Sequence, residues 1–488
     1  MMTPSSTRPA SGPGFDDGLV RGTPSSAGVD ADAVVAFLDA VEAKGLELHS
    51  FMLHRAGRVV AEAWWWPYGP PRRRIMHSLA KSLTSCAIGL AIDEGLLQLR
   101  DKVIAFFPER LPDIVDDKLA AMTVEDLLTM RTGHGAEVGG ALWRGIDASW
   151  IDEFFRIPVV HPPGATYVYS SAASYMLAAI LHRVSGKTLH EYLRPRLLEP
   201  LGVHGESWDI GPDGFNPGGN GFTGKTADAL KLGVLMAQGG VWEGRRLLPQ
   251  AWVETATRPH ANDGRYGYHW ATYENGAYAA VGMFVQMAVV FPDHGASLAV
   301  TAAIDGSDKL APLLFEHFPR GFRPAPFRGA AADARLRARL AAIPAVRRIP
   351  SAGVAADWSR AVGRFAVEAN ALGVTEAAFE LAGEACLFHL TDGDGRHSIA
   401  CGREAWIEGA SHMPGRELHH GYRLESSPVN ACARWRDADT LEMTWIFLET
   451  AFRDTVTCRF ADGRVTLERE VNINSAARRH PTLVGRRV

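Results

Sequence analysis

An apolar helix that begins with a serine and a lysine constrains this chain more than any other segment. Its apolar residues recur at helical spacing: Leu79, Leu83, Cys86, Ala87, Leu90 and Ala91. The pattern predicts one helix over Ser78–Glu94, closed by Gly95 in a left-handed cap. We expect Cys86 in the core.

Ser78 and Lys81 share one face of this predicted helix, because residues at i and i+3 are neighbours. Positive potential at a helix N-terminus favours a Ser78 alkoxide and the neutral amine of Lys81. A desolvated lysine can act as a base at neutral pH. The pair therefore predicts an activated nucleophile. The structural alternative is that Ser78 only caps the helix and Lys81 is a solvated first-turn residue.

Two further segments follow in order along the chain. Pro163–Ser171 is a Gly/Pro turn followed by Tyr169 and two hydroxyls, and an apolar helix is predicted over Tyr175–Val184. Tyr278–Gln286 leads into a predicted strand over Met287–Phe291.

With these companions, the chain resembles the serine β-lactamase and penicillin-binding-protein-like hydrolases. The resemblance is to the class C-like branch, which also holds esterases and 6-aminohexanoate-dimer (nylon oligomer) hydrolases. It covers Gly22 to Pro326 and includes two more motifs, Met122–Gly133 and Glu199–Val203. The implied fold class is α+β: a β-lactamase/transpeptidase-like antiparallel sheet flanked by helices, with an all-helical subdomain.

The resemblance implies a role for each matching residue. Ser78 would be the nucleophile, Lys81 its proton acceptor and Tyr169 the general acid that later activates water. Gly282 matches the glycine of the family's third motif. The backbone N–H groups of Ser78 and Met283 would form the oxyanion hole. This chemistry implies no metal and no organic cofactor.

The sequence departs from the family pattern at two motifs. Ala280 stands where a Lys or His usually binds the substrate carboxylate, which argues against β-lactamase and DD-peptidase activity. Ser171 replaces an asparagine, yet a serine can still hydrogen-bond to the lysine. Gln286 is either a support of the site or a residue of the strand surface. Tyr167 and Tyr175 are expected in the core.

These residues predict a serine hydrolase that forms an acyl-enzyme on a carboxylic ester or a small amide. Three alternatives stay open. The first is an amidase or peptidase of the nylon-oligomer or D-amino-acid-peptide type, and the second is an acyltransferase on the same residues. The third is a catalytically silent binding protein that keeps the fold.

Composition excludes several other classes of function. The chain has 488 residues, 47% hydrophobic content and a net charge of −4, so it offers no basic surface for nucleic acid. No run of apolar residues is long enough to span a membrane. The five cysteines show no metal-ligand spacing. We expect reduced thiols in the cytoplasm, and the alternative is a disulfide among the four C-terminal cysteines.

Changes in composition and residue pattern along the chain predict four segments. Residues 1–14 are rich in Pro, Ser and Gly and read as a disordered leader, and residues 15–326 form the hydrolase domain. Residues 327–353 read as a helix-prone linker. Residues 354–488 alternate like strands and predict an antiparallel β-barrel or β-sandwich. This last domain could narrow the catalytic cleft, mediate a homodimer or only stabilise the fold.

Several local elements are predicted as well. Ala31–Ala43 is a helix capped by Asp30, and Ser50–His54 pairs with Val59–Trp66 in a hairpin. Tyr266–Tyr273 reads as a strand. Asp-Gly pairs at residues 392–395 and 462–463 mark hairpin turns. His412, His419 and His420 are expected to be surface residues without a metal.

Overall fold

The computed structural model describes residues 15–347 and 357–488, which form two compact units, Met1–Pro344 and Ala345–Val488. The predicted leader, residues 1–14, lies outside the described residues. The boundary between the units falls within residues 327–353, the segment predicted as a linker. No helix in the described part of the chain is both long and apolar enough to cross a membrane.

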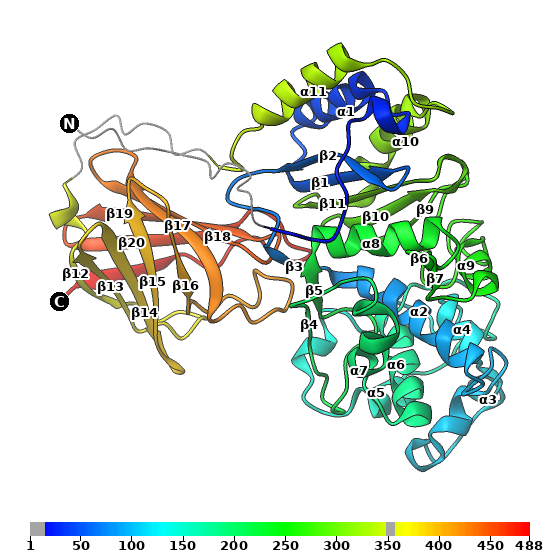
Figure 1. The fold of residues 1–488 in the computed structure, drawn as a ribbon. Helices are drawn as coiled ribbons and strands as arrows, with labels where there is room; N and C mark the ends of the chain where they lie inside the picture. The colour runs from blue at the N-terminus through cyan, green and yellow to red at the C-terminus, as the bar shows by residue number, and fades with distance from the viewer. Residues whose placement is uncertain (1–14, 348–356) are drawn as a thin grey trace. The chain divides into compact units, whose positions relative to one another are not determined.

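A six-stranded antiparallel sheet forms the centre of the first unit (Figure 1). Its strand order is β2-β1-β11-β10-β9-β8. The strands are β1 (Leu48–Arg55), β2 (Arg58–Trp64), β8 (Ala271–Thr272), β9 (Tyr278–Gly282), β10 (Gln286–Phe291) and β11 (Ala296–Ala302). The predicted hairpin near the N-terminus is confirmed, although Trp65 and Trp66 lie beyond the end of β2.

Helices cover both faces of this sheet (Figure 1). The helix α8 (Thr226–Ala237) packs against β1, β10 and β11, and the opposite face is covered by α1 (Ala31–Ala43), α10 (Ala311–Gly321) and α11 (Ala330–Ala341). The predicted bounds and Asp30 cap of α1 are confirmed. The helix α11 lies inside the segment predicted as a linker, and it packs on α1.

The remaining helices form the all-helical part that the family resemblance implies. They are α2 (Ala80–Asp93), α3 (Asp117–Ala121), α4 (Val124–Leu128), α5 (Trp150–Arg156), α6 (Ser171–Ser185), α7 (Leu189–Leu193) and α9 (Gln250–Thr257). Every residue of α2 from Ala80 to Ala91 is buried, as its apolar sequence requires. Small sheets join this part to the rest: β3 (Arg73–Ile75), β4 (Ser207–Trp208) with β5 (Phe222–Lys225), and β6 (Val241–Trp242) with β7 (Arg245–Arg246).

The strand predicted over Tyr266–Tyr273 is wrong for most of its length. Only Ala271–Thr272 pairs in the sheet, as β8. His269 has φ of 62°, a left-handed conformation that no extended strand contains. Alternating apolar residues therefore line a turn here rather than one side of a strand.

The second unit is a closed antiparallel barrel (Figure 1). Ten strands follow the order β15-β14-β13-β12-β21-β20-β19-β18-β17-β16, and a parallel contact between β15 and β17 closes the sheet on itself. The strands are β12 (Gly363–Val367), β13 (Glu376–Ala382), β14 (Ala385–Asp392), β15 (Gly395–Arg403), β16 (Ile407–Ser411), β17 (Ser427–Trp435), β18 (Thr440–Phe447), β19 (Arg453–Ala461), β20 (Arg464–Val471) and β21 (Leu483–Arg487). Of the two predicted architectures, the chain forms the barrel.

Both predicted Asp-Gly turns join neighbouring strands of this barrel. Asp462 and Gly463 connect β19 to β20 with φ of 51° and 71°, which is the conformation of a two-residue type I′ hairpin. The turn after Asp392 connects β14 to β15. These residues predicted the two hairpin turns correctly because their backbone preferences are local.

The expectation that His419 is a surface residue is wrong. Its side chain is buried, and Nε2 lies 2.9 Å from Asp454 Oδ1. The two residues are far apart in sequence, so no local pattern pairs them. All five cysteines are buried free thiols: Cys86, Cys386, Cys401, Cys432 and Cys458.

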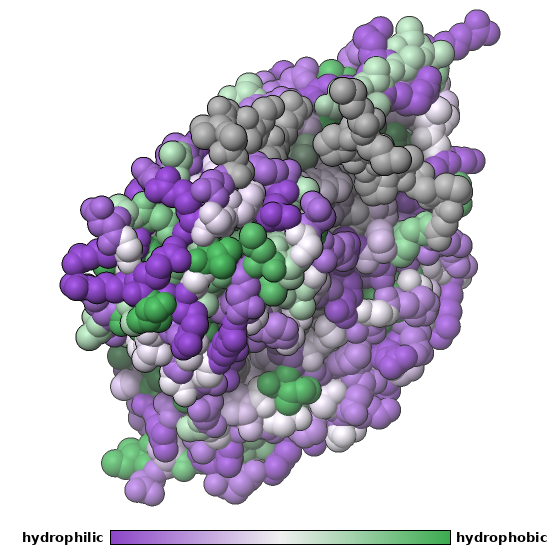
Figure 2. Space-filling model, turned by 90° about the vertical axis from the view of Figure 1, so that its left-hand side faces the viewer, coloured by the Kyte–Doolittle hydropathy of each residue, from purple (hydrophilic) through white to green (hydrophobic). Residues whose placement is uncertain are grey.

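In the view of Figure 2, hydrophilic residues cover most of the face shown, and hydrophobic residues gather there only in small groups. Small apolar groups are normal on protein surfaces. Candidate sites are therefore better sought in the cavities.

Candidate active site

Ser78 sits at the junction between a tight turn and the buried helix α2. It belongs to a short 3-10 helix, His77–Leu79, that leads directly into α2. The preceding His77 has φ of 49° and is buried, with its ring edge-on to Phe284 at 5.4 Å between centroids. A non-glycine residue with positive φ is uncommon and concentrates at functional sites. This turn places the Ser78 hydroxyl in a cavity rather than in the core.

The Lys81 ammonium nitrogen is buried and lies next to Ser78. Nζ donates to Ser78 Oγ at 3.1 Å, to Ser171 Oγ at 3.1 Å and to the Gly219 carbonyl at 2.9 Å. Burial lowers the pKa of Lys81 to about 7, since charge is costly in a desolvated position. Near neutral pH a large fraction of Lys81 is therefore the neutral amine, which can accept a proton.

Tyr169 lies beside both Lys81 and Ser78. Its ring centroid is 4.9 Å from Lys81 Nζ, and its side chain is half-buried. Burial raises the pKa of Tyr169 to about 12, an effect that hydrogen bonding with Ser78 partly offsets. The phenol therefore keeps its proton at neutral pH and is able to donate it. Tyr169 stands just before α6, whose N-cap Ser170 accepts a bond from the Ala173 amide.

Gly282 lets the end of β9 lie directly on the turn that carries Ser78. A Cβ atom at Gly282 would lie 2.1 Å from the Met76 carbonyl oxygen, so no other residue fits without movement. The close approach brings Met283, the next residue, to the cavity that Ser78 lines.

Gln286 supports the turn that contains Met283. Its buried side chain donates from Nε2 to the carbonyl oxygens of Met283 (3.3 Å), Phe284 (3.2 Å) and Ala302 (3.0 Å). Of the two interpretations open at the sequence level, support of the turn is the one that these contacts favour. Gln286 acts on the cavity through the backbone, since it does not line the cavity itself.

These side chains open into one cavity of about 370 Å³. It is lined by Ser78, Lys81, Tyr167, Tyr169, Asn262, Arg265, Tyr266, His269, Ala271, Val281, Gly282, Met283, Phe284, Val285, Gly306 and Ser307. None of these lining residues is acidic. Within residues 15–347 and 357–488, Arg265 has no ion-pair partner and its side chain is exposed. The cavity thus brings together Ser78, Lys81, Tyr169 and an exposed arginine.

The aromatic residues of this cavity escaped the sequence analysis. Tyr167 is half-buried and lines the cavity, so its expected core position is wrong. Its ring and that of Tyr266 are 5.3 Å apart, and Tyr266 is edge-on to Tyr169 at 6.3 Å. Alternation of Tyr167 and Tyr169 on one extended segment was the available signal, because i and i+2 side chains can share a face.

His269 was also missed, and it has a structural role. Nδ1 lies 3.0 Å from the Leu128 carbonyl and Nε2 lies 2.9 Å from Ser174 Oγ, which identifies the neutral tautomer with its proton on Nδ1. Burial, and then the charge of Lys81, lowers the pKa of His269 to about 3. A permanently neutral histidine here adds no competing base to Lys81.

Among the residues that the structure describes, no cluster of His, Cys, Asp or Glu could hold a metal ion. Ser78, Lys81 and Tyr169 are of the residue types that serve as nucleophile, base and proton donor in acyl transfer.

Known proteins are similar to this chain in sequence. The profile of the family described as Beta-lactamase matches residues 38–316. The chain is 26% identical over 248 residues to the 6-aminohexanoate-dimer hydrolase of Paenarthrobacter ureafaciens, which covers 48% of this chain and 63% of that protein. It is 26% identical over 150 residues to the lovastatin esterase of Penicillium rubens, covering 26% of this chain and 37% of that protein. The matches thus span less than two thirds of either relative.

A solved structure shows the same fold. A Bacillus anthracis protein assigned to the 6-aminohexanoate-dimer hydrolases superposes with a TM-score of 0.51 at 17% identity. The superposition covers 61% of this chain and 85% of that one. At this identity the likeness concerns the fold alone.

Proposed function

Because this chain belongs to the Beta-lactamase family of hydrolases, we propose that it is a serine hydrolase acting through an acyl-enzyme on Ser78. The substrate class that we propose is a carboxylic ester or a small amide. The observation that carries the proposal is the 3.1 Å contact between Ser78 Oγ and a buried Lys81 whose pKa is lowered to about 7.

In acylation, neutral Lys81 accepts the Ser78 proton while Ser78 Oγ forms a bond to the substrate carbonyl carbon. The N–H groups of Ser78 and Met283 stabilise the negative charge that develops on the carbonyl oxygen, an effect of about 3 kcal/mol. Tyr169 then donates its proton to the leaving alkoxide or amine as the bond to it breaks. The Lys81 ammonium returns a proton to the Tyr169 oxygen, so the site is restored.

In deacylation, a water molecule attacks the acyl carbon. Tyr169 passes its own proton to neutral Lys81 as it removes a proton from this water. The Lys81 ammonium then protonates Ser78 Oγ as the bond between Ser78 and the acyl carbon breaks. The same residues serve both half-reactions in opposite directions.

The absence of a Lys or His at Ala280 favours esters and linear amides over β-lactams. The names of two relatives agree with this preference, since one acts on a 6-aminohexanoate dimer and the other is a lovastatin esterase. Arg265 is placed to meet an anionic group on such a substrate, because the cavity has no acidic lining residue to neutralise it.

The proposal is tested by intact-mass spectrometry after incubation with a fluorophosphonate. Assays with short-chain p-nitrophenyl esters, a linear amide dimer and nitrocefin run in parallel. We expect one adduct, on Ser78, with turnover of ester or amide and none of nitrocefin. Ser307→Ala, which removes another hydroxyl of the same cavity, should still be labelled, whereas Ser78→Ala should not.

A folded protein that forms no adduct would instead be a binding protein on this fold. Rapid cleavage of nitrocefin would show that the cavity accepts β-lactams without the missing cation. An ester-to-amide ratio of kcat/KM then assigns the preferred bond.

The compartment that we propose is the cytoplasm, because all five cysteines are free thiols and pairs such as Cys386 and Cys401 stand opposite each other without bonding. A homodimer stays a prediction. Sedimentation of the full chain in the analytical ultracentrifuge measures its oligomeric state.

A further inference from the structure

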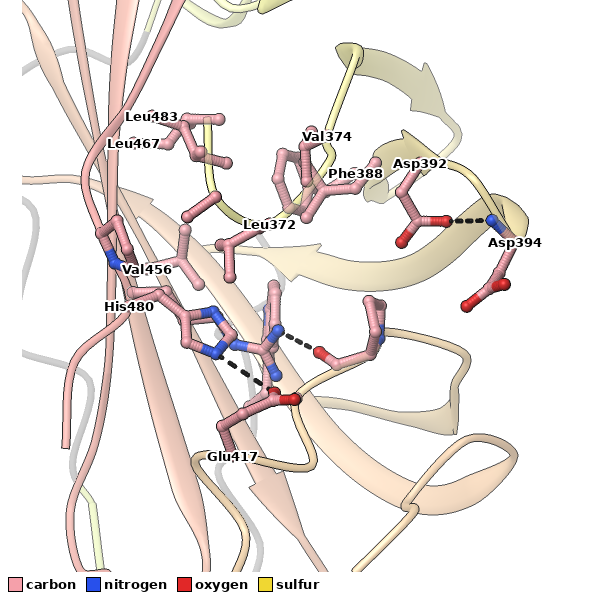
Figure 3. Close-up of a pocket in the computed structure, with 17 residues that line it drawn as sticks. Leu372, Val374, Phe388, Asp392, Asp394, Glu417, Val456, Leu467, His480 and Leu483 are labelled. Carbon is pink, nitrogen blue, oxygen red and sulfur yellow. Dashed lines mark hydrogen bonds and ion pairs between the residues drawn. The ribbon is translucent and has the colours of Figure 1, made fainter. Parts of the chain in front are cut away.

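The C-terminal barrel contains a cavity of its own, of about 280 Å³, at one end of its strands (Figure 3). In an up-and-down barrel, alternate connections lie at the same end. Lining residues come from four such connections: β12–β13, β14–β15, β16–β17 and β20–β21. The cavity therefore opens at the end of the barrel that these connections share. All of its lining residues belong to this unit.

Most of the cavity wall is apolar. The apolar lining residues are Ala371, Leu372, Val374, Phe388, Leu390, Pro414, Trp445, Val456, Leu467, Pro481 and Leu483. Figure 3 shows Leu372, Val456, Leu467 and Leu483 around the opening between the strands. An apolar concave wall with a few polar groups is typical of small-molecule sites, and this volume lies at the small end of their range.

The one arginine of the cavity is neutralised within the protein. Arg469 donates from Nε to Asp454 Oδ2 at 2.8 Å, and its Nη2 lies 2.6 Å from the same oxygen. Nη1 donates to the Pro414 carbonyl, and the guanidinium lies 5.0 Å from the Trp445 ring centroid. His419 hydrogen-bonds to the other oxygen of Asp454. Arg469 therefore closes the cavity as part of a buried ion pair.

Three carboxylates remain at the rim: Asp392, Asp394 and Glu417. Asp392 keeps a lowered pKa, against the cost of its burial, because His397 and the Asp394 amide hydrogen-bond to it. His480 lies 3.8 Å from Glu417, but burial lowers its pKa to about 4, so it is neutral at physiological pH. The lining residues thus combine an apolar wall with a net negative rim.

We propose that the barrel binds a small amphiphilic amine, with its apolar body in the cavity and its ammonium at Asp392, Asp394 and Glu417. The apolar body gains from burial against the wall. The ammonium meets the exposed carboxylates of Asp394 and Glu417, beside Asp392, which is already paired with His397. A carboxylate of the same length would add a fourth negative charge, since Arg469 is already paired with Asp454.

The test is isothermal titration calorimetry on the full chain with octylamine, octanol and octanoate, each below its micellar concentration. These probes share one chain length and differ only in the head group. We expect octylamine to bind about tenfold more tightly than octanol, because several exposed charge pairs of modest strength act together. Octanoate should bind most weakly.

The charge at the rim is tested by Glu417→Gln combined with Asp394→Asn. Both side chains are exposed, so the variant should fold normally. It should lose the preference for octylamine and keep its affinity for octanol. The matched control is Glu384→Gln with Asp462→Asn, which removes two charges from turns at the opposite end of the barrel and should change nothing.

The location is tested by Ala371→Trp, which places a large ring at an exposed position of the cavity mouth. It should abolish binding of octylamine and octanol. The proposal is overturned if octanoate binds more tightly than octylamine, if none of the three probes binds, or if Ala371→Trp leaves binding intact. The last result would locate the amine elsewhere, for example in the cavity of Ser78.

Discussion

At the scale of single residues, the proposed function depends on a lysine whose charge is buried away from water. Lys81 is 2% exposed, and in the described part of the chain it donates to neutral acceptors only, namely two hydroxyls and a carbonyl. These three acceptors orient the amine, but none compensates for the free energy lost when its charge is removed from water. The resulting pKa near 7 is what makes the residue useful as a base.

The first prediction concerns the pH dependence of hydrolysis. Since the ammonium of Lys81 cannot accept a proton, kcat/KM for an ester should rise with pH and level off above a midpoint near 7. Tyr169, with a pKa of about 12, should cause no fall at moderately alkaline pH. Stopped-flow or plate assays across this pH range measure the profile, and a flat profile would contradict the role of Lys81.

The second prediction concerns stability. Between pH 7 and the ordinary lysine pKa of 10.5, the unfolded chain binds the proton of Lys81 and the folded chain does not. The free energy of unfolding therefore rises with pH in this window. Below pH 7 the folded protein bears the full cost of burying the charged Lys81 ammonium. Lys81→Met should remove this cost, so its gain in stability should be larger at pH 6 than at pH 10 by up to about 4 kcal/mol.

Urea denaturation of the wild type and Lys81→Met at both pH values measures this difference. The comparison cancels the other titrating groups, because both proteins share them. An equal gain at the two pH values would mean that Lys81 titrates normally in the folded state. Loss of activity with retained fold would accompany either result.

The third prediction concerns substrate charge. Arg265→Ala should raise KM about tenfold for a substrate with a terminal carboxylate, and leave the KM of its methyl ester unchanged, because only the former has a charge to lose. Arg245→Ala, an exposed arginine of β7 that does not line the cavity, is the control. Equal effects on both substrates would indicate that Arg265 acts through general packing.

At the scale of elements, the site depends on how closely β9 approaches the turn before α2. Gly282 allows this approach, and Gln286 fixes the turn that follows it. The elements themselves were largely predictable, because α1, α2 and the hairpin of β1 and β2 have strong local patterns. The turn at Tyr266–His269 was not predictable, since its left-handed residue is held by contacts with α2, α4 and α6.

The fourth prediction follows from this approach. Gly282→Ala would place a methyl group 2.1 Å from the Met76 carbonyl oxygen, so β9 and the Met283 amide must shift. We expect kcat to fall about a hundredfold, the usual result of losing one oxyanion donor. Labelling of Ser78 by a small, highly reactive phosphonate should fall much less.

A control for this prediction is Gly233→Ala in α8. Its added Cβ would lie 3.5 Å from Ser297, an ordinary contact, and alanine favours helices over glycine. This variant should keep full activity and be slightly more stable. If both glycine variants behaved alike, the close approach of β9 would not be what positions the oxyanion hole.

At the scale of the whole molecule, the chemistry belongs to the first unit. Every residue that lines the Ser78 cavity lies before residue 344. The helix α11 belongs to this unit through contacts with α1, including Arg335 with Asp32 at 2.6 Å and Arg339 with Asp39 at 2.7 Å. Asp333 also accepts a bond from Ser25 Oγ at 2.6 Å in a buried position.

The fifth prediction uses this division. A chain that ends at Pro344 should fold and react with the fluorophosphonate at Ser78, whereas one that ends at Pro326 lacks α11 and should melt several degrees lower. Loss of α11 exposes the apolar surface beneath Leu336 and removes Asp333, the hydrogen-bond acceptor of Ser25 Oγ. Equal melting temperatures would show that α11 is an attachment rather than part of the unit.

The sequence alone was enough for the fold class and for the residues proposed as nucleophile, base and acid. Helical spacing, turn residues and short ordered motifs are local properties of the chain, and a resemblance to a family rests on them. The contacts of Ser171 and Gln286, the wall formed by Tyr167 and Tyr266, and the free charge of Arg265 were decided only by the tertiary structure. They depend on burial and on distances between segments far apart in sequence, and desolvation, which lowers the pKa of Lys81, exists only once the chain has folded around it.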